Sequence, residues 1–151
     1  MNILAIDPGT EQSGWCLFDG KRVANSGVNE NESLLALIAG KPAAVLAIEM
    51  VASYGMPVGR ETFETVRWIG RFQQAWHSPE EVRLVYRRDV KLYLCGSMKA
   101  KDANVRQALI DKLGPVGTKA NPGPLYGVKS HAWSALAVAV TAMALAPLVS
   151  L

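Results

Sequence analysis

The sequence predicts an α/β fold in which helices flank both faces of a five-stranded mixed sheet. Two observations support it. Three short apolar segments joined by brief turns open the chain, and two later apolar segments alternate with helical patterns without any internal repeat. This order of elements is typical of a layered α/β domain with a mixed sheet. The 151 residues are enough for one hydrophobic core, so we expect a single domain over residues 1–151.

The first half of the chain contains four predicted strands and one helix. Asp19-Gly20 is a hairpin signal between the second and third strands. Leu34, Leu35 and Ile38 form the apolar face of the helix, and Gly40 closes it. The strands are expected at residues 2–6, 13–18, 22–27 and 43–48, and the helix at residues 31–39.

The second half is mainly helical. Apolar residues recur every three or four positions from Phe63 to Trp76, which indicates an amphipathic helix. Asp102 is suited to cap a later helix. Seven glycines and prolines in residues 114–127 predict an exposed, mobile loop. The expected elements are helices at 60–76, 87–94, 102–113 and 131–146, and a strand at 82–86.

Composition narrows the class of protein. Residues 132–146 are apolar but fall short of the roughly 20 needed to span a bilayer. The amino-terminal sequence has no signal-peptide pattern, so we expect a cytoplasmic protein without a membrane partner.

Charge is distributed unevenly along the chain. Residues 1–59 carry three basic and six acidic side chains, whereas residues 60–129 carry thirteen basic and seven acidic ones. This distribution suits a protein that holds a polyanion, although a solvated basic face would give the same pattern.

Two carboxylates stand at the ends of buried strands. Asp7 follows the apolar run 3–6, and Glu49 follows the run 44–48. Because desolvating a carboxylate is costly, such a position suggests a cation, a partner or a reaction. Each residue alone is also compatible with a turn or a strand end that reaches solvent. Together they predict one metal site.

These residues resemble the RuvC branch of the ribonuclease H-like nucleases, the Holliday-junction resolvases, which include short phage versions. Matching segments occur in the family's order over nearly the whole chain. They are residues 3–10 with Gly14, residues 47–49, residues 99–105 and residues 131–139. The resemblance implies a ribonuclease H-like fold and a metal-dependent endodeoxyribonuclease that acts on four-way junctions or other branched DNA.

The resemblance also implies roles for individual residues. Family members bind metal through an aspartate ending the first strand, a glutamate ending the fourth and residues opening the last helix. These positions match Asp7, Glu49, His131 and Ser134, where many members carry a further aspartate instead of Ser134. Lys101 is implied as a catalytic basic residue. DNA contacts are expected from Tyr54, Arg60, Lys99, Lys101 and Arg106.

Cofactor and partners follow from the same chemistry. Two divalent cations about 3.5 to 4 Å apart can activate water and stabilise the leaving oxygen in phosphodiester hydrolysis. Carboxylates suit Mg²⁺, whereas the nitrogen of His131 favours Mn²⁺. Two symmetric cuts in a junction require a homodimer, for which the helix at 60–76 is the expected interface.

Two alternatives remain open. Ser134 is a poor ligand for a divalent cation, which favours a non-catalytic protein that binds branched DNA. Residues 7–10 with Gly14 also resemble the phosphate loop of actin-like ATPases and sugar kinases. Those enzymes close a second domain over the nucleotide, for which 151 residues leave no room, so no nucleotide cofactor is expected.

Overall fold

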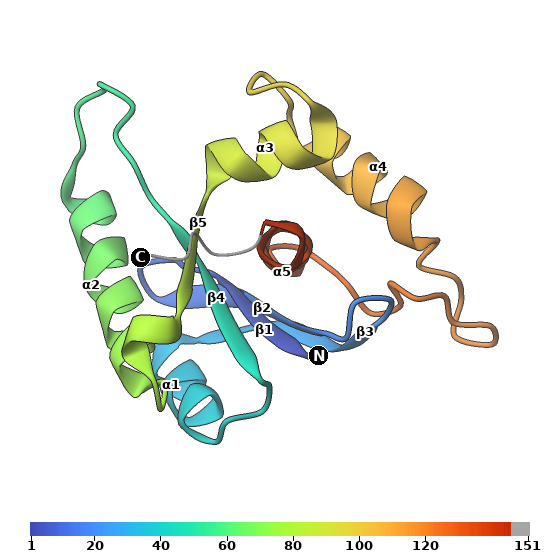
Figure 1. Cartoon of the computed structure of the whole chain (residues 1–151), viewed down its shortest axis with the longest axis horizontal. Coiled ribbons are helices and arrows are strands. Elements are labelled where there is room, and N and C mark those ends of the chain that lie inside the picture. Colours follow the sequence, from blue (N-terminus) through green and yellow to red (C-terminus); the bar gives the residue numbers. More distant parts are fainter. Residues whose placement is uncertain (146–151) are drawn as a thin grey trace.

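The computed structural model describes residues 1–145, and a five-stranded mixed sheet forms its centre (Figure 1). The strand order is β3-β2-β1-β4-β5. The first three strands pair antiparallel, and β4 runs parallel to both β1 and β5. The predicted fold class is therefore confirmed. Ala146, the predicted end of the last helix, lies outside the described residues.

The observed elements follow the predicted order closely. The strands are β1 (Ile3–Asp7), β2 (Gln12–Phe18), β3 (Val23–Glu30), β4 (Val45–Met50) and β5 (Arg83–Tyr86). The helices are α1 (Asn31–Ala39), α2 (Arg60–Ala75), α3 (Arg87–Cys95), α4 (Asp102–Leu113) and α5 (Ala132–Ala144), with a short 3₁₀ turn at Pro79–Glu81. None of the helices within residues 1–145 has both the length and the apolar character needed to cross a bilayer.

Alternation along the strands divides the core into two clusters, one on each face of the sheet. On one face, Ile3, Ala5 and Ala47 pack with the buried residues of α5 and with α3 and α4. On the other face, Leu4, Ile6, Leu46 and Ile48 pack against α1 and α2. Successive side chains of a strand point to opposite faces, so β1, β2 and β4 contribute to both clusters. Helices cover both faces, as predicted, and Figure 1 shows α5 (red) on the side of the sheet opposite α1 and α2.

The ends of two strands and the buried face of one helix differ from the sequence prediction. Glu49 lies inside β4 rather than after it, because the parallel pairing with β5 extends through Met50. Strand β3 continues to Glu30, where the antiparallel pairing with β2 holds it. In α2, Phe63 and Val66 are exposed, and the buried residues are Ile69 and Phe72.

Residues 114–130 are more structured than a mobile loop. Leu125 and Val128 are buried in the core on the α5 face. Gly117 and Pro122 form a β-bridge, and the Val23 amide donates to the Pro124 carbonyl at 2.9 Å. Glycine and proline content correctly located the turns of this segment. It did not indicate that Leu125 and Val128 anchor the segment in the core.

Candidate active site at the carboxyl ends of β1 and β4

Asp7 and Glu49 meet because β1 and β4 are adjacent and parallel. Ile6 pairs with Ile48, so the next residues of the two strands are the two acids. Strand alternation places Asp7 on the same face as Ala5, and Glu49 on the same face as Ala47. That face is the one covered by α5. Each side chain shifts the pKa of the other, so the two carboxyl groups lie close together.

The environment of the pair favours its protonated forms. Burial raises the pKa of Asp7 to about 6, although the Glu49 hydrogen bond and the Arg87 charge act to lower it. Burial and the negative charge of Asp7 raise the pKa of Glu49 to about 7, against the opposing effect of Arg87. Two buried carboxylates in contact resist a second negative charge. A cation placed between them would remove this cost.

His131 approaches the pair from the start of α5. It is the N-cap residue of that helix, and its Nδ1 lies 3.2 Å from Oδ2 of Asp7. Gly14, which pairs with Asp7 across β1 and β2, makes the approach possible. A Cβ at position 14 would lie 2.4 Å from the His131 carbonyl oxygen. Glycine at this position therefore lets the helix reach the sheet beside Asp7.

A buried polar network holds the turn after Asp7. The Ser13 hydroxyl donates to Oδ1 of Asn31 at 2.6 Å and accepts the Gly9 amide at 3.0 Å. The Asn31 amide group donates back to the Gly9 carbonyl at 3.0 Å. These contacts fix the backbone that follows the first carboxylate.

Ser134 lies one helical turn after His131 and is half-buried. It lines a pocket of about 250 Å³ together with His131, Arg87, Asp102 and Arg106. The structure thus brings Ser134 to the edge of the site.

Arg87 and Asp102 are site residues that the sequence analysis missed. Arg87 directly follows β5 and donates from Nη1 to Oε1 of Glu49 at 3.4 Å. Its Nη2 pairs with Oδ1 of Asp102, the first residue of α4. A signal is present in the sequence, because Arg87 directly follows the predicted strand at 82–86. The sequence predicts only a helix-cap role for Asp102, but the N-cap residue of α4 is Lys101.

The donor set fits a hard divalent cation in part. Asp7 and Glu49 supply two adjacent carboxylates, and Mg²⁺ is often bound by one or two carboxylates with water completing its shell. Within residues 1–145, however, no group of three or more His, Cys, Asp or Glu side chains is arranged to hold a metal. The His131 nitrogen faces the Asp7 oxygen instead.

Of the basic residues predicted to contact DNA, Arg106 is the one that lines the pocket beside the site. Its Cζ lies 5.1 Å from the centroid of the Trp133 ring, at the pocket shared with His131. Lys101 is the exposed N-cap residue of α4, and Lys99 is exposed just before it. Neither lysine belongs to the residues that line this pocket.

Tyr54 and Arg60 belong to a separate exposed segment. Tyr54 occupies the loop between β4 and α2 with 53% of its surface exposed and a positive φ of 50°. Arg60 is the first residue of α2 and is also exposed. The loop begins directly after β4, so Tyr54 follows Glu49 by five positions.

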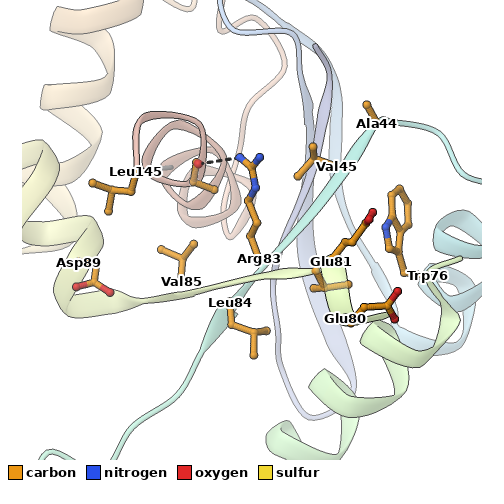
Figure 2. Close-up of a pocket in the computed structure, with 12 residues that line it drawn as sticks. Ala44, Val45, Trp76, Glu80, Glu81, Arg83, Leu84, Val85, Asp89 and Leu145 are labelled. Carbon is orange, nitrogen blue, oxygen red and sulfur yellow. Dashed lines mark hydrogen bonds between the residues drawn. The ribbon is translucent and has the colours of Figure 1, made fainter. Parts of the chain in front are cut away.

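A larger pocket of about 590 Å³ lies away from the carboxylates (Figure 2). The lining of this pocket includes Val45 and Arg83, the first residues of β4 and β5. Asp7 and Glu49 lie at the other ends of their strands, β1 and β4. Arg83 donates to the Ala142 carbonyl at 3.1 Å, shown as a dashed line. Glu80, Glu81 and Asp89 also line this pocket, and their negative charge opposes nucleic acid binding there.

The sheet order and the helices on both faces define a ribonuclease H-like α/β fold. RuvC from Thermus thermophilus has this fold and matches 93% of this chain and 92% of its own, with a TM-score of 0.68 and 21% identity. T. thermophilus RuvC in complex with a Holliday junction substrate matches the same shares with a TM-score of 0.67 and 22% identity. No protein-family model and no curated protein matches the chain. The chain therefore has a RuvC-like fold, as the resemblance of its motifs predicted.

Proposed function

We propose that this protein is a metal-dependent endodeoxyribonuclease that cleaves Holliday junctions or other branched DNA. The observation that carries the proposal is the Asp7–Glu49 pair, which sits at the carboxyl ends of adjacent parallel strands in a RuvC-like fold. The solved RuvC in complex with a Holliday junction substrate supports the substrate class.

Asp7 and Glu49 would hold Mg²⁺ or Mn²⁺, and two cations per site is the stoichiometry expected for phosphodiester hydrolysis. Bound there, the metal supplies Lewis acidity toward the phosphate and lowers the pKa of its water. Asp7 is the proposed bridging ligand because it ends the central strand of the sheet, beside Glu49 on the neighbouring strand and 3.2 Å from His131. His131 and Ser134 complete the proposed ligand set at the start of α5.

The DNA-binding surface in this proposal extends from both sides of the carboxylates. Lys99, Lys101 and Arg106 would contact backbone phosphates near α4, and Lys101 would also stabilise the leaving group. Tyr54 and Arg60 would contact the junction on the other side, where the exposed ring can stack on an unpaired base.

Symmetric cleavage of a junction requires two active sites, so we propose a homodimer. Helix α2 provides an exposed apolar pair for its interface, with Phe63 61% and Val66 37% exposed. Large apolar side chains on an outer helix face are typical of contact surfaces.

A labelled synthetic four-way junction incubated with Mg²⁺ or Mn²⁺ tests the proposal. Site-specific nicks that disappear in Asp7→Asn and Glu49→Gln support it, and greater activity in Mn²⁺ supports a nitrogen ligand at His131. A linear duplex of the same sequence is the control for structure selectivity. Absence of both binding and cleavage would refute the proposal.

The second candidate is a non-catalytic protein that binds branched DNA. Ser134 favours it, since the serine stands in the first turn of α5 beside His131, and a hydroxyl binds divalent cations poorly. Tight junction binding without cleavage in either metal would select this function.

A further inference from the structure

The pocket beside the acid pair has the chemistry of an anion site. Its lining includes the guanidinium groups of Arg87 and Arg106, the imidazole of His131 and the hydroxyls of Ser130 and Ser134. Arginine hydrogen bonds to carboxylate and phosphate oxygens with the same planar geometry.

One carboxylate of the protein itself already lines this pocket and pairs with one of its arginines. The Asp102 carboxylate pairs with Arg87 Nη2, and its side chain is 84% exposed whereas that of Arg87 is 35% exposed. The carboxylate therefore approaches a half-buried guanidinium from the solvent side. A phosphate arriving from solvent would meet Arg87 on the side that Asp102 covers.

Arg106 is held on another wall of the same pocket. Its guanidinium lies over the Trp133 ring, 5.1 Å from the centroid. This cation–π contact holds the Arg106 side chain beside the pocket. The guanidinium carries five N–H donors, so Arg106 can donate to an anion while the contact is kept.

The pocket adjoins the proposed catalytic pair through direct contacts. Arg87 donates from Nη1 to Glu49 at 3.4 Å, and His131, another lining residue, contacts Asp7 at 3.2 Å. A phosphate bound by Arg87 would thus lie next to the carboxylates.

We propose that Arg87 and Arg106 form a binding site for a DNA backbone phosphate, and that Asp102 competes with this phosphate for Arg87. This inference rests on the proposed function and adds a specific phosphate site to it. In the free protein, Asp102 holds Arg87 in place. On DNA binding, a phosphate oxygen displaces the Asp102 carboxylate.

Junction affinity in EDTA, where cleavage is prevented, tests the competition directly. Fluorescence anisotropy over a range of salt concentrations would be measured for the wild type and for Asp102→Asn, Arg87→Gln and Arg106→Gln. We expect Asp102→Asn to bind about two- to fivefold more tightly, as fits loss of an exposed ion pair. Arg87→Gln and Arg106→Gln should bind more weakly, and each should reduce the salt slope by about one.

Two controls separate competition from a general charge effect. Asp111→Asn removes the same charge from the same helix, where Asp111 accepts a hydrogen bond from Gln107, and should leave affinity nearly unchanged. In the Arg87→Gln background, Asp102→Asn should give no gain. Asp102→Ser serves as a second variant if the asparagine disturbs the start of α4.

Two results would overturn the inference. One is a gain in junction affinity from Asp102→Asn that persists in the Arg87→Gln background. The other is no gain in affinity from an Asp102→Asn protein whose circular dichroism and melting temperature match the wild type. In either case, wild-type junction binding would leave the proposed function standing. A wild-type protein that binds no branched DNA would overturn the proposed function itself, and the phosphate site with it.

Discussion

Nδ1 of His131 lies 3.2 Å from Oδ2 of Asp7, in a contact between residues 124 positions apart. Asp7 also raises the pKa of Glu49 from the neighbouring strand, so its carboxylate stands between the fourth strand and the last helix. A change at Asp7 therefore affects both neighbours.

Asp7→Asn should abolish cleavage while preserving junction binding. The amide keeps the shape of the side chain but loses the negative charge that a cation requires. Because a metal supplies several kcal/mol of transition-state stabilisation, we expect a rate loss on the order of 10²-fold or more. Single-turnover cleavage and anisotropy with the same junction would measure both properties. Nicking at the wild-type rate would exclude Asp7 as a ligand.

The metal-free protein should lose stability as the pH rises from about 4 to about 7. Burial raises the pKa of Asp7 from 3.8 to about 6 and that of Glu49 from 4.5 to about 7. In this range the folded state binds more protons than the unfolded state, so the free energy of unfolding falls with increasing pH. Urea denaturation in EDTA at several pH values would show the slope. Asp7→Asn should flatten it and stabilise the protein by about 1 to 3 kcal/mol at pH 7, whereas an unchanged slope would contradict the raised pKa values.

Ser134→Asp should tighten metal binding. The side chain is half-buried beside His131, and a carboxylate there adds a charged oxygen ligand to the site. We expect the Mn²⁺ dissociation constant to fall on the order of tenfold, measured by isothermal titration calorimetry. Ser97→Asp adds the same charge to the exposed segment before α4 and should have little effect. Equal effects of the two changes would remove Ser134 from the site.

Tyr54→Ala should weaken junction binding. The ring is 53% exposed in the loop after β4, and stacking on a base contributes about 1 to 3 kcal/mol. This corresponds to a dissociation constant about five- to a hundredfold higher. Met56, which is 71% exposed in the same loop, provides the matched control as Met56→Ala. If both variants bind alike, Tyr54 does not stack on DNA.

Phe63→Glu should convert the proposed dimer to a monomer. A charge in the centre of an apolar interface is costly to bury. Sedimentation velocity would show the change in mass. Leu92→Glu places the same charge at an exposed apolar position of α3, 45% exposed, and should leave the dimer intact. A wild-type monomer would refute the proposed dimer, and a dimer in Phe63→Glu would place its interface outside this face of α2.

Local patterns predicted most of the fold. The boundaries of α1 were predicted to the residue, and those of α2 to within one. The prediction was wrong where the decisive interaction is distant in sequence. Helical spacing marked Phe63 and Val66 as core-facing, but spacing alone cannot tell which part of an apolar stripe meets another element.

The site was predicted only in part, because some of its contacts also join residues that are distant in sequence. Asp7 and Glu49 could be located because each one interrupts an apolar strand. Arg87 and Asp102 enter the site through β5 and α4, and their contact requires knowing that β5 lies next to β4. The roles of His131, Ser134 and the DNA-binding residues stay predictions.

Helix α5 packs on all five strands of the sheet, and this has a consequence for synthesis of the protein. The ribosome makes this helix after all five strands, so until then one apolar face of the sheet lacks the cover that α5 provides. A chain stalled before residue 131 keeps both strand carboxylates but lacks the helix that brings histidine to them. Assembly of the site therefore waits until translation has passed α5, and a copy that stops before this helix cannot bring His131 to Asp7.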